Sequence, residues 1–200
     1  MKFYLKICLF VVYTLIAWSA VAQAPENAAD ICPLLIGETI PSATLIDAYG
    51  NQVSLQERIQ QKPTILVFYR GGWCPYCNKQ LSGLAEIERE IMDLGYQILA
   101  ISPDDYRNLK STEEKGQFNY TLLSDPGGIF IQQTGIAFKT SAALKGFIGS
   151  KGQQGEISEI MPVPTVMVLD VQGKIRFEYL NPNYKERIPA AMLLAVLKTL

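Results

Sequence analysis

Short continuous apolar runs are the strongest pattern along the chain. Their β-branched and aromatic residues predict strands, and the first two runs read as central strands covered on both faces. A smaller pair of apolar segments flanks the turn signal Tyr49-Gly50-Asn51-Gln52 and predicts a hairpin. The four predicted strands outside this hairpin are Thr64–Tyr69, Gln97–Ser102, Thr165–Asp170 and Ile175–Leu180.

Apolar residues at helical spacing separate these runs. A helix is predicted from Pro75 to about Leu94, where Gly95 ends it. Further helices are expected after Pro103-Asp104-Asp105, in a short stretch up to Thr134, and over Pro189–Leu200, with an irregular middle before the third strand. This order predicts an α/β fold in which a mixed sheet carries helices on both faces.

Composition narrows the chemistry. The chain has 200 residues, of which 48% are hydrophobic and 18% charged, enough for one folded domain with a sizeable core. The formal net charge of −1 gives no basic footprint, so no nucleic-acid partner is expected. The sequence contains no histidine, which excludes Ser-His-Asp and Cys-His catalysis and imidazole metal sites. No metal and no cofactor are expected.

The first 22 residues are typical of a signal peptide. Lys2 and Lys6 precede an apolar stretch shorter than a membrane span, and Ala20-Val21-Ala22 is a suitable cleavage site. An uncleaved anchor is the alternative. We expect residues 1–22 to be removed, 23–32 to be a flexible leader and 33–200 to form the domain. The mature protein would be exported to a periplasmic or other extracytoplasmic compartment, without a stable membrane anchor.

The chemistry concentrates at Cys74-Pro75-Tyr76-Cys77, a Cys-x-x-Cys motif between a buried strand and a helix. Pro75 suits the first helical position, which places Cys74 at the N-cap. The unpaired amides and the helix dipole there favour a thiolate. Cys77 lies one turn along the same face and is expected to be more buried and less acidic. The pair reads as an attacking and a resolving thiol.

Three other interpretations of the motif are weaker. A structural disulfide closing so short a loop would stabilise the fold little. A zinc site would need two further ligands in a chain without histidine, and a copper carrier suffers from the same lack of imidazole.

The segment Phe68–Cys77, together with Val163-Pro164-Thr165 before a strand, resembles the thioredoxin fold. The stretches Ala100–Asp104 and Leu122–Gly127 resemble more specifically the alkyl hydroperoxide reductase/thiol-specific antioxidant (AhpC/TSA) family, in its peroxiredoxin-like branch. The resemblance covers about residues 33 to 200. It implies a thioredoxin-like three-layer sandwich and thiol-peroxidase activity.

The chain departs from the family pattern at groups that bind peroxide. Peroxiredoxins carry Thr or Ser three residues before the reactive cysteine, where this chain has Gly71, and Val67 stands at the position of the motif's proline. Pro164 stands where the family's peroxide-binding arginine would be. Arg70 is a hypothetical substitute cation, with a solvated strand-end residue as the alternative.

The resemblance also assigns supporting roles. It implies a cis peptide bond before Pro164, so that Val163 presents its backbone to an incoming chain beside Cys74. Trp73 would cover the cysteines with a partly exposed apolar face, or else be an ordinary packed aromatic. No acid is evident behind the cysteines. Cys32 reads as a free buried thiol, a second resolving thiol or an intermolecular link.

Two enzyme hypotheses follow. The first is a thiol peroxidase that reduces hydroperoxides through a Cys74–Cys77 disulfide, which a thioredoxin-type reductant resets. The alternative is an exported thiol–disulfide oxidoreductase that exchanges with a protein disulfide and has little peroxidase activity. A binding module without catalysis is disfavoured by the intact dithiol.

Overall fold

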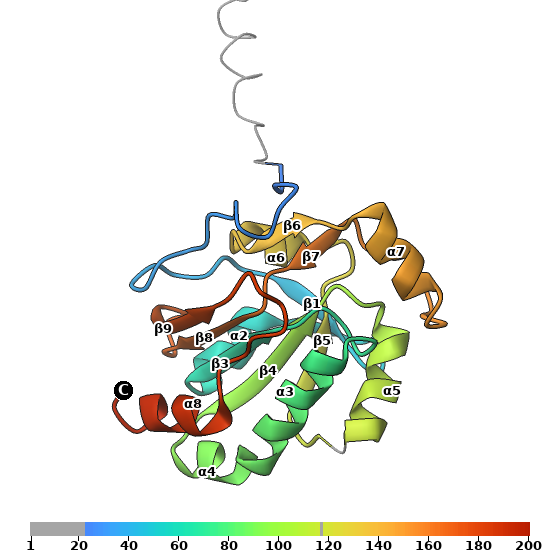
Figure 1. Ribbon diagram of the computed structural model, residues 1–200. Coiled ribbons are helices and arrows are strands. Elements are labelled where there is room, and N and C mark those ends of the chain that lie inside the picture. Colours follow the sequence, from blue (N-terminus) through green and yellow to red (C-terminus); the bar gives the residue numbers. More distant parts are fainter. Residues whose placement is uncertain (1–22, 117) are drawn as a thin grey trace, which may run out of the picture.

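A mixed sheet of seven strands, in the order β2-β1-β5-β4-β3-β8-β9, forms the middle layer of the computed structural model (Figure 1), which describes residues 23–116 and 118–200. Strands β3, β4 and β5 are parallel, and the remaining neighbours pair antiparallel. Its strands are β1 (Thr44–Asp47), β2 (Gln52–Ser54), β3 (Thr64–Phe68), β4 (Gln97–Ser102), β5 (Thr121–Ser124), β8 (Thr165–Leu169) and β9 (Ile175–Leu180).

Helices cover both faces of this sheet, so the fold is the expected three-layer sandwich. A hydrophobic core lies on each face of the sheet, and successive residues of β3 point alternately into one or the other. Ile65 and Val67 pack in the first core, and Leu66 and Phe68 pack in the second. The first face is covered by α3 (Pro75–Glu86), α4 (Glu88–Asp93), α5 (Tyr106–Gly116) and α8 (Ala190–Leu197). The second is covered by α2 (Leu55–Gln61) and α6 (Ile129–Gln133).

The topology gathers four segments at one edge of the sheet. Phe68, the last residue of β3, pairs with Ile101 of parallel β4 and with Thr165, the first residue of antiparallel β8. Thr165 in turn pairs with Leu180, the last residue of β9. The Cys-x-x-Cys loop, the turn after β4, the segment before β8 and the segment after β9 therefore meet there.

Several elements differ from the sequence prediction. The long helix breaks at Ile87, whose φ and ψ of −108° and 6° are not helical, and continues as α4. Helix α2 was not predicted; Ser54 begins it by accepting a hydrogen bond from the backbone N–H of Glu57. The irregular middle contains β6 (Ala137–Lys139), α7 (Ala142–Gly149) and β7 (Ile160–Pro162), with β6 and β7 forming a second sheet.

The leader expected to be flexible instead packs on the domain at residues 24–26. Ala24 is buried, Pro25 accepts a backbone hydrogen bond from Lys139, and Glu26 pairs with the Lys139 ammonium at 2.6 Å. The expected signal peptide, residues 1–22, lies outside the described residues. Among those described, no helix combines the length and apolar character that a membrane span requires.

Candidate active site

Cys74 occupies the N-cap of α3 and Pro75 its first helical position, as the sequence predicted. The residue has extended backbone angles, and its carbonyl accepts hydrogen bonds from the N–H groups of Cys77 and Asn78. Cys74 and Cys77 are both free thiols and both buried. The helix thus sets the two sulfurs one turn apart, within contact of each other.

The two thiols have opposite acidities. The pKa of Cys74 is lowered to about 6, chiefly because the Cys77 thiol donates a hydrogen bond to its sulfur, with Arg70 and Arg187 adding positive charge. Burial raises the pKa of Cys77 well above its usual range. The Cys77 thiol lowers the pKa of Cys74 more than the backbone amide of Cys77 does. This order agrees with the N-cap geometry, in which the Cys74 side chain makes no regular capping hydrogen bond to a backbone amide. One sulfur is therefore a thiolate at neutral pH and the other a thiol.

Arg70 is a buried member of this site, so the alternative of a solvated strand-end cation is wrong. Its side chain is 7% exposed and lies between two aromatic rings, with its guanidinium carbon 5.0 Å from the Trp73 ring and 4.3 Å from that of Tyr184. Its Nε is buried without a hydrogen-bond partner. Stacking holds the positive charge near Cys74 and leaves hydrogen-bonding capacity unused.

Arg187 is a second cation at the cysteines, and the sequence analysis missed it. Its Nη2 lies 3.4 Å from Cys77 Sγ. It belongs to the segment 181–189 between β9 and α8, in which Tyr184 meets both Arg70 and, edge to face, Tyr76 at 5.7 Å. Ile188 is buried in the core below. The only sequence signal is that β9 ends at the edge where the Cys-x-x-Cys loop begins.

An acid also lies beside the cysteines, contrary to the sequence analysis. Asp104, in the turn after β4, accepts hydrogen bonds from the Gly72 N–H at 2.9 Å and the Trp73 Nε1–H at 3.2 Å. Burial raises the pKa of Asp104 to about 7, and the charge of Cys74 adds to the rise. A Cβ at Gly71, whose φ is +143°, would overlap both Asp104 and the Trp73 ring. The carboxylate thus fixes the loop that precedes Cys74.

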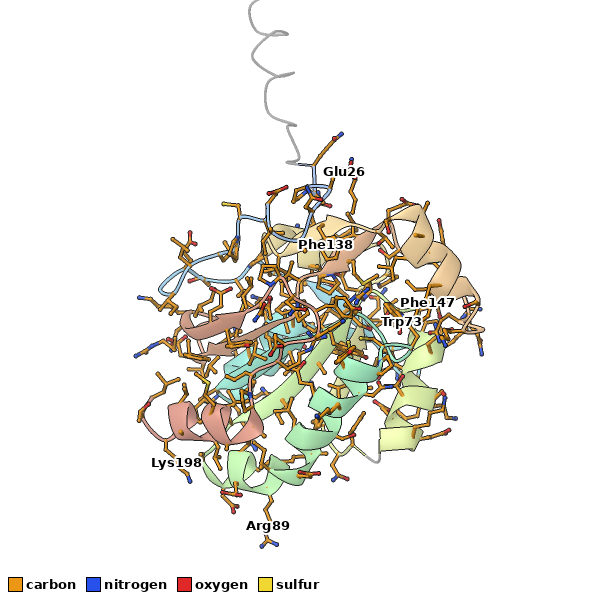
Figure 2. The ribbon with its side chains drawn as sticks, viewed as in Figure 1. Glu26, Trp73, Arg89, Phe138, Phe147 and Lys198 are labelled. Carbon is orange, nitrogen blue, oxygen red and sulfur yellow. The ribbon has the colours of Figure 1, made fainter. Side chains whose placement is uncertain are left out.

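Trp73 is packed rather than partly exposed. Its side chain leaves 8% of the residue accessible, and its ring meets Phe147 of α7 edge to face at 6.1 Å (Figure 2). The expectation of a partly exposed apolar face at Trp73 is wrong, and the alternative of a packed aromatic is confirmed, because α7, which the sequence analysis did not predict, covers the ring.

The Val163–Pro164 peptide bond is trans, so the cis bond that the resemblance implied is wrong. The expected presentation of the Val163 backbone is wrong as well. Its N–H donates to the Ile136 carbonyl at 2.8 Å, and its carbonyl accepts from the Thr165 hydroxyl at 2.9 Å. Both backbone groups are therefore occupied within the fold, and Val163 is fully buried.

Two further expectations concern other groups. Cys32 is exposed, so it is not the buried thiol that the sequence analysis considered. No group of three or more histidine, cysteine or carboxylate side chains in residues 23–116 and 118–200 is arranged to hold a metal ion.

The model of the AhpC/TSA family matches residues 36–178. Peroxiredoxin Bcp of Escherichia coli K12 is 34% identical over 104 residues, which are 52% of this chain and 66% of that protein. Peroxiredoxin bcp1 of Schizosaccharomyces pombe is 32% identical over 100 residues, 50% of this chain and 51% of that protein. The matches thus span just under two thirds and about half of these relatives.

Solved structures share the fold. Peroxidoxin BcpB of Mycobacterium tuberculosis superposes with a TM-score of 0.66 at 23% identity, covering 82% of this chain and 97% of that one. Reduced Prx3 of Vibrio vulnificus, solved in complex with hydrogen peroxide, gives 0.70 at 18% identity over 82% and 96% of the two chains. The similarity extends over nearly all the described residues.

Proposed function

Because the chain belongs to the AhpC/TSA family, we propose that it is a thiol peroxidase that reduces hydroperoxides at Cys74. The observation that carries this proposal is the pair of opposed acidities: a Cys74 thiolate in contact with a Cys77 thiol. A thiolate is the form that attacks peroxide, and a neighbouring thiol is the group that resolves the product.

The proposed cycle has three steps. The Cys74 thiolate attacks the terminal oxygen of the hydroperoxide, the O–O bond breaks, and Cys74 becomes a sulfenic acid while an alcohol or water leaves. Cys77 then condenses with it, forming the Cys74–Cys77 disulfide and releasing water. A thioredoxin-type dithiol returns both cysteines to thiols. We further propose that this takes place outside the cytosol, because residues 1–22 are typical of a signal peptide.

Positive charge substitutes for the peroxide-binding groups that the chain lacks. Gly71 and Pro164 supply neither a hydroxyl nor a guanidinium, but the Arg70 guanidinium contributes positive charge at Cys74. Arg70 also has a buried N–H without a partner, which is suited to the developing negative charge on a peroxide oxygen.

The alternative, a thiol–disulfide oxidoreductase, loses one support in this structure. Its incoming polypeptide was expected to pair with the Val163 backbone, and both backbone groups of Val163 are engaged internally.

The two functions are separated by mixing reduced protein with hydrogen peroxide or with a disulfide peptide at pH 7. We expect loss of the two thiols of Cys74 and Cys77 with peroxide at least ten times faster than for a free thiol of equal pKa. Oxidation at the free-thiol rate, with rapid exchange, would instead establish the alternative.

Arg70→Met should slow peroxide oxidation of Cys74 by about three- to tenfold at pH 7, because it removes a charge that lowers the pKa of Cys74 and a donor facing the peroxide. The change keeps an unbranched side chain between the two rings. Stopped-flow oxidation is the measurement, and Arg176→Met, at an exposed arginine of β9, is the matched control. An unchanged rate in Arg70→Met would exclude this role.

A further inference from the structure

Cys77 is a buried sulfur that has to carry negative charge twice in the proposed cycle. It attacks the Cys74 sulfenic acid as a thiolate, and it leaves as a thiolate when the disulfide is reduced. Its side chain is fully buried, and burial raises its pKa well above the usual range. A sulfur in such surroundings is slow to form a thiolate and a poor leaving group.

Arg187 is positioned to offset this penalty. Its Nη2 contacts Cys77 Sγ at 3.4 Å, and its charge lowers the pKa of Cys77. Its Nη1 donates to the Glu186 carbonyl, whereas its Nε is buried without a partner. None of the ion pairs among residues 23–116 and 118–200 includes Arg187, so a carboxylate does not neutralise its charge.

The surrounding segment holds this guanidinium in place. Tyr184 packs on Arg70 and Tyr76, and buried Ile188 anchors the chain on the other side of Arg187. Arg70 stays on its two rings, and its guanidinium acts mainly on Cys74, whereas Arg187 reaches the second sulfur. Both cations lower the pKa of Cys74, and Arg187 in addition contacts the sulfur of Cys77.

We propose that Arg187 is a catalytic residue for the chemistry of Cys77. Its guanidinium stabilises the Cys77 thiolate both when this sulfur attacks to form the disulfide and when it leaves during reduction. The inference rests on the proposed function, since it concerns the second sulfur of that cycle. It assigns one arginine to each cysteine: Arg70 to the attack on peroxide, and Arg187 to the making and breaking of the disulfide.

In the oxidative half, the Cys77 thiolate attacks the Cys74 sulfur, the S–O bond breaks, and the hydroxide released takes up the proton that Cys77 gave up. In the reductive half, a thiolate of the external dithiol attacks the Cys74 sulfur, and the S–S bond electrons leave on Cys77, which is then protonated by solvent. The second thiol of the dithiol displaces Cys74 from the mixed disulfide, so the dithiol is oxidised and both cysteines are reduced.

The experiment compares Arg187→Gln with Arg187→Lys, and uses Lys185→Gln as the matched control that removes a positive charge from the same segment. Three rates are measured at pH 8: peroxide attack on Cys74, disappearance of the sulfenic acid, and reduction of the disulfide by dithiothreitol. The pKa of Cys74 is about 6 in the unsubstituted protein, and Arg187 makes the smallest of the contributions that lower it, so we expect Cys74 to stay mostly ionised at pH 8 in the Arg187 variants. Thermal melting reports whether each variant is folded.

Arg187→Gln should leave the first rate within about twofold and slow the other two by about tenfold, the effect expected on losing a charge-assisted hydrogen bond. Arg187→Lys should restore much of both rates, and Lys185→Gln should behave as the unsubstituted protein. If Arg187→Gln is folded and neither the disappearance of its sulfenic acid nor the reduction of its disulfide is slowed, the inference is overturned. Equal slowing of all three rates would also overturn it, by placing Arg187 at the peroxide step or in the framework.

Failure of the proposed function gives a different result. If the unsubstituted protein reacts with peroxide no faster than a free thiol, the peroxidase proposal fails. The Cys74–Cys77 disulfide can then be formed with a small-molecule disulfide instead, and its reduction by dithiothreitol still tests Arg187.

Discussion

Cys74→Ser should abolish peroxide turnover, with a loss of at least a thousandfold, because a serine hydroxyl is not ionised at neutral pH and cannot accept the peroxide oxygen as sulfur does. In the unsubstituted protein the rate of Cys74 oxidation should rise with pH, reach half its maximum near pH 6 and level off above about pH 7, following the ionisation of this thiol. Peroxide consumption in the presence of dithiothreitol measures turnover, and single-turnover oxidation gives the pH profile.

Cys77→Ser should give a different defect. The first oxidation of Cys74 should persist, while the sulfenic acid accumulates and can be trapped by a sulfenate-reactive probe. The pKa of Cys74 should rise as well, since its largest lowering contribution comes from the Cys77 thiol. Cys32→Ser is the control, because that cysteine is exposed and far along the chain from the motif. Identical loss in both active-site variants would point to a structural bridge.

Asp104→Asn should change how the free energy of unfolding depends on pH. The folded-state pKa of Asp104, about 7, lies above its unfolded value of 3.8, so between these values the folded protein binds more protons than the unfolded chain. Stability contributed by this group is therefore present below about pH 4 and is lost as the pH rises to 7. The loss is on the order of 2–4 kcal/mol, and Asp104→Asn should remove it.

Urea unfolding at intervals from pH 4 to pH 7 measures this slope. The series stops at pH 7 because the ionisation of Cys74 changes the free energy of unfolding in the opposite direction. It adds stability as the pH rises from about 6, the pKa of Cys74 in the folded protein, towards 9.0, its value in the unfolded chain. Asp105→Asn is the matched control, since Arg107 lowers the pKa of Asp105 and its titration lies mostly below this window. A slope that survives in Asp104→Asn would show that this carboxylate is not the group responsible.

The sequence predicted what is encoded locally. Strands β4 and β9 have the bounds that the apolar runs indicated, and Cys74 and Pro75 take the helical positions that their residue types favour. Elements were missed where the local signal is weak: β6 has three residues, and α7 combines glycines with apolar residues exposed to solvent. The break at Ile87 arises within a pattern that otherwise fits one continuous helix.

The rest of the site depends on tertiary placement. Asp104 and Arg187 are far from the motif in sequence, and only the register of β4 and β9 on the sheet brings them to the cysteines. Arg70 could be singled out beside the motif, but its burial depends on Tyr184, which comes from the other end of the chain. The error at Pro164 has a similar cause, because the hydrogen bond from Val163 to Ile136 is invisible in a local motif.

The packing of Trp73 has a practical consequence. The sequence has two tryptophans, Trp18 and Trp73, so a protein beginning at residue 23 retains a single indole. That indole is next to Cys74 in the chain, donates to Asp104 and lies under Arg70. Its fluorescence would therefore report the state of this one locus without any added dye, allowing each half of the cycle to be followed optically in real time.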